Sequence, residues 1–174
     1  MKKMLRCFIF FTSLFFFNIA SSNESIYYVD MDFIMNNSSA GKSIIKQLEN
    51  KNKSYSASFK KNEIDLKEEE TKLISQKAIL EKKDFDQKVI SFNNKVLIYK
   101  KKRKNILNGF VKQKNNAQKD LIKKLKPILA DYSQKNSISF ILPKQSIIIG
   151  KSELDLTNTI IEIFDKKIKN IKLK

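Results

Sequence analysis

A heptad repeat of apolar residues occupies the middle of this chain and limits what the chain can fold into. Residues recur there at alternating steps of four and three, with one charged interruption, at Phe85, Val89, Phe92, Val96, Tyr99, Arg103, Ile106 and Phe110. That spacing is typical of a helix that packs one narrow stripe of side chains against a second helix. We call this stripe the seam.

A second, weaker stripe with the same spacing precedes the first and mirrors it. It consists of Ile45, Leu48, Tyr55, Phe59, Leu66, Leu73 and Leu80. One point between Lys82 and Lys83 is the centre of symmetry for six pairs: Leu80–Phe85, Leu73–Phe92, Leu66–Tyr99, Phe59–Ile106, Tyr55–Phe110 and Leu48–Ala117. The sequence therefore predicts one long antiparallel helical hairpin over residues 39–134, with its tip within residues 79–86.

Charge blocks on the two arms support this fold-back. Acidic residues gather on the first arm and basic residues on the second, at Glu63, Asp65 and Glu68–Glu70 and at Lys95 and Lys100–Lys104. A tip near Lys82 places the two blocks side by side. Arg103 falls on the seam, where it can extend to the surface or pair with Asn62 in the same layer.

The first 22 residues have the organisation of an export signal. Lys2, Lys3 and Arg6 form a basic start, residues 7–20 are a mostly apolar run rich in Phe, and Ala20-Ser21-Ser22 offers small residues to a signal peptidase. A bilayer span needs about 20 apolar residues, so the run is short for an anchor, although an uncleaved anchor is the alternative. We expect cleavage after Ser22, an exported protein, and a fall in formal net charge from +17 by three to +14.

Short β-type segments flank the predicted hairpin. Residues 23–38 contain a strand at 25–30 and a helical turn, and residues 135–174 contain strands at Ile138–Leu142 and Ile147–Ile149. A last helix carries the apolar face Ile160, Ile161, Phe164 and Ile168. Pro127 is expected to kink the second arm or end it, and the apolar stripe that continues afterwards favours a kink.

Three short strands form a marginal sheet by themselves, which predicts that neighbouring chains complete it. The residues expected in this assembled body are Ile26, Tyr28, Ile138, Phe140, Leu142, Ile147 and Ile149. The predicted fold is thus mainly α: a long antiparallel coiled-coil hairpin that projects from a small, short-stranded β body completed by association of chains.

The composition argues against an enzyme and against a cofactor or metal. The chain has no His, and its one Cys lies in the export signal, so histidine-based catalysis and the usual zinc sites are excluded. Three Gly in the whole chain provide no phosphate-binding loop. We interpret Asp30 and Asp32 as capping residues and Glu68–Glu70 as a hydrated helix face.

Two sets of residues on the arms are candidates for binding. The basic set is Lys95, Lys100, Lys101, Lys102 and Lys104, which either balances the acidic block or contacts anionic partners. The second set is aliphatic and lies off the seam, either packed between the arms or facing a bound protein. It comprises Ile64, Ile74, Ile79, Ile90, Leu97 and Ile98, of which Ile90, Leu97 and Ile98 are the closest to the basic set.

The order of these elements resembles the OmpH/Skp family of periplasmic chaperones. The matching stretches are IYYVDMDFIMNNSSAGKSIIKQLE at 26–49, AILEKKDFDQK at 78–88 and ISFILPKQSIIIGKSELDLTNTII at 138–161, and the resemblance covers the whole mature chain. It implies a homotrimer in which a small β body carries three helical hairpins around a cavity. It also implies a periplasmic location, binding of unfolded outer-membrane proteins in that cavity, and association with anionic lipid or lipopolysaccharide. Pro127 departs from the family pattern.

Two other functions compete with this one. A structural coiled-coil spacer or adaptor of the cell envelope would share the export signal and the heptads but would bind a folded partner at one patch. A basic nucleic-acid-binding protein is suggested by charge alone. The export signal, the acidic block and the lack of clustered surface aromatics argue against specific nucleic-acid binding.

Overall fold

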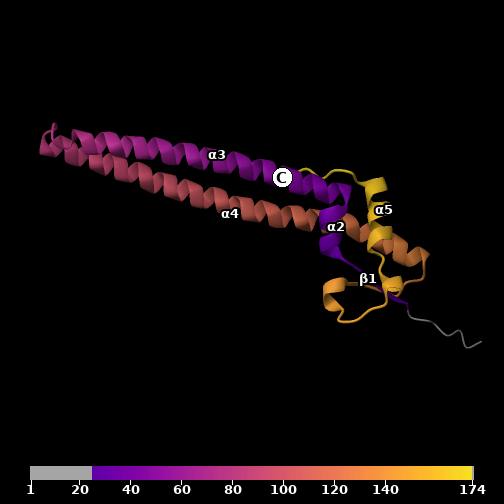
Figure 1. Ribbon diagram of the computed structural model, residues 1–174. Helices are drawn as coiled ribbons and strands as arrows, with labels where there is room; N and C mark the ends of the chain where they lie inside the picture. The colour runs from indigo at the N-terminus through magenta and orange to yellow at the C-terminus, as the bar shows by residue number, and fades with distance from the viewer. Residues whose placement is uncertain (1–24, 174) are drawn as a thin grey trace, which may run out of the picture.

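The computed structural model describes residues 25–173 and consists of a long helical hairpin attached to a small body (Figure 1). The arms of the hairpin are α3 (Ser39–Gln76) and α4 (Lys82–Lys135). The body contains the end of α4 together with β1 (Ile26–Val29), α2 (Met31–Asn37), β2 (Phe140–Pro143), the 3-10 turns η2 (Lys144–Ser146) and η3 (Ser152–Leu154), and α5 (Thr157–Lys167). The predicted class, mainly helical with a small sheet, is confirmed. The predicted export signal lies outside the described residues.

The arms pair in the predicted register. The rings of Tyr55 and Phe110 meet edge to face, with centroids 5.9 Å apart, and Lys51 Nζ lies 2.9 Å from Gln113 Oε1. Half-buried residues recur along α3 in steps of four and three, as the seam requires. Every second layer of α3 holds a polar residue, namely Asn62, Glu69 or Gln76. These polar layers explain why the apolar repeat of the first arm is the weaker one.

The connection between the arms lies nearer the end of α3 than the predicted tip does. The helices are joined by residues 77–81, which overlap the expected 79–86 only in part, and Lys82 and Lys83 belong to the first turn of α4. Lys88 lies beside Gln76, with Nζ 2.8 Å from Oε1, as the mirrored register of the arms requires. Helix α4 therefore begins about 9 Å beyond the end of α3, and residues 77–81 cover that distance. Because residues 82–84 contain neither Gly nor Pro and Asp84 suits a first turn, α4 starts early.

The apolar core sits at the base of the hairpin. Helix α4 contributes Ala117, Leu121, Leu125 and Ile128, spaced by four, four and three, so that all four face one side. Ile34, Ile44, Ile160 and Phe164 join them from α2, α3 and α5. Helix α4 continues through Pro127, so that proline does not end the helix.

The end of α4 is set by its last backbone contacts. Ser137 has a φ of 53°, and the Ile138 amide donates to the Ser133 carbonyl at 3.0 Å. This six-to-one contact after a left-handed residue is the Schellman arrangement. It turns the chain from α4 into β2.

The sheet has two strands rather than the three expected. Strands β1 and β2 are parallel, with Ile26 opposite Phe140 and Val29 opposite Pro143. The predicted strand Ile147–Ile149 does not form in the described chain, and Ile148 and Ile149 are 99% and 91% exposed. The other edge of β1 is occupied instead by residues 155 and 156, since Asp155 bridges Tyr28 and the Leu156 amide donates to the Tyr28 carbonyl at 2.9 Å.

Gly41 stands where the backbones of α2 and α3 approach each other. Its amide donates to Ser38 Oγ, which caps α3, and a Cβ atom at this position would lie 1.9 Å from the Met35 carbonyl oxygen. Gly109 lies inside α4, and apart from its neighbours and the adjacent backbone of its own helix, no atom comes within 4 Å of the place its Cβ would take.

The two glycines therefore predict opposite effects of the same substitution. Gly41→Ala should destabilise the fold by roughly 1–3 kcal/mol because the α2–α3 corner must open. Gly109→Ala should stabilise it by about 0.5–1 kcal/mol, since alanine restricts the unfolded chain. Denaturant unfolding of both variants beside the parent chain measures the difference. Equal stability of the Gly41→Ala variant and the parent would contradict the close approach.

Cross-linking tests the register of the arms. In a chain with Cys7 replaced by Ser, cysteines at Lys51 and Gln113 should join through a short bis-maleimide within one chain, because these side chains touch. Cysteines at Lys51 and Lys102 serve as the control, since position 102 lies about 16 Å farther along α4. A control pair that links as well as the first pair would show that the register is wrong.

Candidate functional site

The outer side of α4 exposes the aliphatic residues that the sequence placed off the seam. Ile90, Leu97 and Ile98 are 61%, 62% and 67% exposed. Residues seven and eight apart share one side of a helix, and the seam residues Val89, Phe92 and Val96 hold the opposite side against α3. We call Ile90, Leu97, Ile98 and the lysines at 100, 101, 102 and 104 the arm face.

The first arm carries a corresponding set. Ile64, Ile74 and Ile79 are 48%, 65% and 82% exposed, with Ile79 in the connection between the arms. None of the six off-seam aliphatic residues packs between the arms, so that alternative is wrong. Their side chains are available to another molecule.

The basic residues divide into two groups. Lys95 forms an ion pair with Glu69 on α3 and so helps to hold the arms together. Lys100, Lys101, Lys102 and Lys104 are exposed and take part in no ion pair within residues 25–173. Only this second group leaves its charge uncompensated by a contact.

Arg103 crosses the seam to Glu63, not to Asn62 as the sequence suggested. Its Nη1 lies 2.9 Å from Glu63 Oε1, and its guanidinium lies 5.3 Å from the centre of the Phe59 ring. The Asn62 amide instead donates to the Ser58 carbonyl of its own helix. A carboxylate attracts the guanidinium more strongly than an amide does, and Glu63 is the next residue along.

Tyr99 joins the same cluster. Its hydroxyl donates to Glu63 Oε1 at 2.7 Å. Burial raises the pKa of Tyr99, and the Glu63 carboxylate adds to the rise because it accepts the proton that ionisation would remove. These half-exposed contacts are each worth about 0–1 kcal/mol, so they fix the register of the arms more than they stabilise them.

A crevice of about 760 Å³ lies along the middle of the arms. Its apolar lining is Leu66, Phe92, Val96, Tyr99 and Leu107, and its charged lining includes Lys100 and Lys104. This crevice was not predicted from the sequence. The signal was present in the charged interruption of the heptad repeat at Arg103, near which the seam is incompletely filled.

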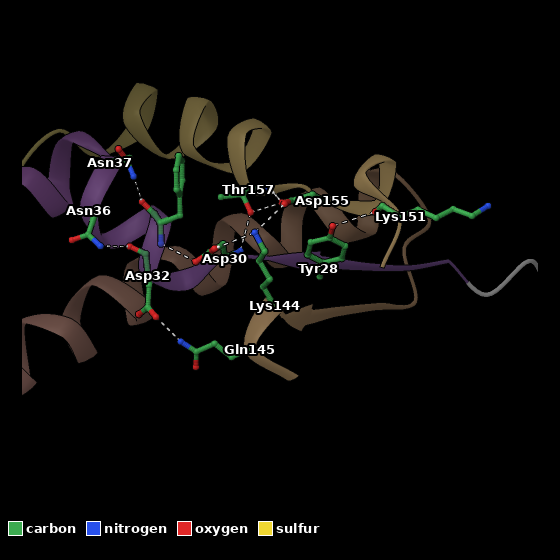
Figure 2. A network of polar contacts seen from close by, with 11 residues as sticks. Tyr28, Asp30, Asp32, Asn36, Asn37, Lys144, Gln145, Lys151, Asp155 and Thr157 are labelled. Carbon is green, nitrogen blue, oxygen red and sulfur yellow. Dashed lines mark hydrogen bonds and ion pairs between the residues drawn. The ribbon is translucent and has the colours of Figure 1, made fainter. Parts of the chain in front are cut away.

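A polar network holds the body together where α2, α5 and η2 meet (Figure 2). Asp30 caps α2 by accepting from the Phe33 amide at 2.9 Å, and its own amide donates to Thr157 Oγ1 at 2.8 Å. Lys144 Nζ lies 3.4 Å from Asp30 and 4.0 Å from Asp155. The Phe33 amide, which donates to the Asp30 carboxylate, lowers the pKa of Asp30 the most, and Lys144 lowers it further. The contacts of ionised Asp30 therefore stabilise the fold at pH values above the pKa that Asp30 has in the unfolded chain. This stabilisation is lost as the pH falls through the lower pKa that Asp30 has in the folded chain.

The seven residues predicted for the assembled body divide between core and surface. Tyr28 and Ile138 are buried within the single chain. Ile26, Phe140, Leu142 and Ile149 are exposed and Ile147 is half-buried. Lys144 and Gln145 anchor the start of the 144–150 loop to Asp30 and Asp32, which leaves its isoleucines at the surface.

Neither a metal-binding group nor a membrane-spanning helix occurs among residues 25–173. No three His, Cys, Asp or Glu side chains lie close enough together to hold a metal ion. No helix there combines the length and the apolar character needed to cross a bilayer. Asp30 and Asp32 are engaged in the cap of α2 and in the contact with Gln145.

Comparison with known proteins agrees with this geometry. Residues 25–164 match the family described as outer membrane protein (OmpH-like). A crystal structure of a protein described as an OmpH-like outer membrane chaperone, from Caulobacter crescentus, superposes with a TM-score of 0.81 at 15% identity, covering 86% of this chain and 89% of the other. No curated protein sequence gave a significant match. The family match spans most of the chain and the fold agrees with it, and the protein therefore belongs to the OmpH-like family.

Proposed function

We propose that this protein is an ATP-independent periplasmic chaperone that holds unfolded outer-membrane proteins between its basic arms and prevents their aggregation. Membership of the OmpH-like family supports a chaperone role. The observation that carries the finer proposal is the arm face, where exposed aliphatic side chains are followed along α4 by four lysines without ion pairs in the described chain.

The physical needs of such a client match this surface. An unfolded β-barrel protein exposes alternating apolar residues and free strand edges, both of which lead to aggregation. Many weak aliphatic contacts can hold such a chain without selecting one sequence. The excess of lysine attracts acidic clients from a distance and does so less at high salt. The same charge suits anionic lipid or lipopolysaccharide as a further partner.

Association into a homotrimer belongs to the same proposal. The body exposes Phe140, Leu142, Ile148 and Ile149 on or beside a two-stranded sheet. A sheet this small is marginal, and large apolar residues seldom gather in one exposed patch at the surface of a monomer. Three copies joined through the body would place three helical hairpins around one cavity.

Separate variants test the two parts of the arm face. Replacing Lys100, Lys101, Lys102 and Lys104 with Gln should slow capture of an unfolded β-barrel client and flatten its salt dependence, because steering acts on the encounter rate. Replacing Ile90, Leu97 and Ile98 with Ser should instead speed release by roughly tenfold to a hundredfold, at about 0.5–0.9 kcal/mol for each partly desolvated side chain. Suppression of client aggregation and stopped-flow binding at several ionic strengths measure both effects.

A charge-matched control separates the arm face from net charge. Lys119, Lys123, Lys124 and Lys126 are exposed on the same helix near its base, and their replacement with Gln removes the same charge. This control should hold clients nearly as well as the parent. If both arm-face variants hold clients as the parent does while keeping its oligomeric state, the chaperone mechanism fails and the spacer function replaces it.

A deletion in the arms and a substitution in the body together test which part of the chain forms the oligomer. Deleting residues 60–105 should leave the number of chains unchanged in light scattering, because the body makes the contact. Replacing Ile148 and Ile149 with Ser should lower that number without lowering the stability of the single chain, since both side chains are exposed there. A monomer after the arm deletion would contradict assembly through the body.

A further inference from the structure

The segment that follows α5 turns back and lies along the start of α3 (Figure 1, yellow). Within residues 168–173, Ile171 is only 4% exposed, Lys172 is exposed and Leu173 is half-buried. Alternation of inward and outward side chains is the pattern of an extended strand. Ile171 enters the buried cluster at the hairpin base that also contains Ile44 and Leu121.

The Gln47 side chain of α3 forms hydrogen bonds with the backbone of this segment. Gln47 Nε2 donates to the Ile171 carbonyl at 2.8 Å, and Gln47 Oε1 accepts from the Leu173 amide at 3.1 Å. A carbonyl and an amide two residues apart are what the facing residue of a parallel strand contacts. The Gln47 carboxamide therefore replaces a neighbouring strand at this point.

The carboxamide is held in place by the turn before it. Gln47 Nε2 also lies within hydrogen-bond distance of the Ser43 carbonyl and of Ser43 Oγ, at 3.1 and 3.2 Å. Ser43 Oγ in turn donates to Asn170 Oδ1 at 2.9 Å. Two backbone contacts and one apolar socket recognise an extended chain by its shape, with little dependence on its sequence.

We propose that Ser43, Gln47 and the socket of Ile171 form a docking site for an extended peptide with alternating apolar residues, which residues 170–173 occupy as an internal competitor. The ligand class follows from the contacts: a strand-like backbone with inward aliphatic side chains at alternate positions. The family match ends at residue 164, so the occupying segment lies beyond the part that the family match covers. The identity of the competing ligand, an unfolded β-strand of a client, rests on the proposed function.

Residues 170–173 compete strongly for the site because they belong to the same chain as the site. A tethered segment faces its site at an effective concentration on the order of millimolar, so a free peptide at micromolar concentration does not displace it. A client that also contacts the arms can displace it, because its own local concentration is then comparable. Residues 170–173 thus exclude isolated short peptides from the site and admit clients that also bind the arms.

The test uses a fluorescent peptide with the sequence of residues 168–174 and the exported chain shortened after Asn170. The shortened chain should bind the peptide in anisotropy titrations at least roughly tenfold more tightly than the intact chain, because its site is empty. Gln47→Leu in the shortened chain should weaken binding by about tenfold, the effect of losing two backbone contacts. Both protein and peptide are basic, so attraction between net charges does not produce this binding.

Matched peptides define the specificity. A peptide with Lys172→Ala should bind as the parent peptide does, because that side chain points outward, whereas one with Ile171→Ser and Leu173→Ser should not bind. If the shortened chain does not fold, the intact chain with Ile171→Ser and Leu173→Ser replaces it, since its own segment is kept but cannot seat. The proposal is overturned if the opened site takes no peptide, if Gln47→Leu changes nothing, or if the intact chain binds equally well.

A parallel measurement separates this site from the proposed function. If aggregation of a β-barrel client is still suppressed while the peptide fails to bind, the docking site is wrong and the holding function stands. If the peptide binds as expected while clients aggregate freely, the docking site stands and the holding function is wrong.

Discussion

The parallel pairing of β1 with β2 is the constraint on which the rest of this structure depends. Parallel strands cannot be joined by a tight turn and need a crossover that returns to its starting level. Here the crossover between Val29 and Phe140 contains the entire hairpin. The two arms must therefore lead out and back along each other, and the core at the hairpin base can form only where they return.

Burial falls off sharply away from that base. Within the described residues between 45 and 116, Phe59 is the only buried side chain. Beyond the core the arms are joined by half-buried seam residues and by exposed contacts such as Lys95–Glu69 and Arg103–Glu63. Regions with few buried contacts open at low free-energy cost, so the outer arms are the least stable part of the fold. The hairpin is thus firm at its base and weakly joined towards its tip.

The short sheet of the body both closes the fold of the chain and leaves an apolar surface exposed. On one edge of β1 the pairing with β2 closes the fold, and on the other Leu156 donates to the Tyr28 carbonyl. Both edges of β1 are thus used within the chain. The aliphatic surface left over lies on the outer strand β2 and on the loop that follows it, where Lys144 is tied to Asp30. Any further strand pairing has to start from β2.

How much of this could be read from the sequence depends on whether neighbouring residues or distant ones decide the outcome. The heptad repeat determined the two arms, their register at Tyr55 and Phe110, and the off-seam position of Ile90 and Leu97, because a helix fixes which residues share a side. The β-forming segment near residue 140 was visible from its own composition, since β-branched and aromatic residues gather there.

Tertiary contacts decided the rest. The connection at 77–81 depends on where each helix stops relative to the other, and a periodic seam matches equally well at several offsets. The isoleucines at 147–149 have the composition of a strand. The second edge of β1 nevertheless pairs with residues 155 and 156, which lie farther along the chain. Gln47 gave no signal at all, because a glutamine on a helix surface becomes a backbone-binding group only when an extended segment 124 residues away is brought beside it.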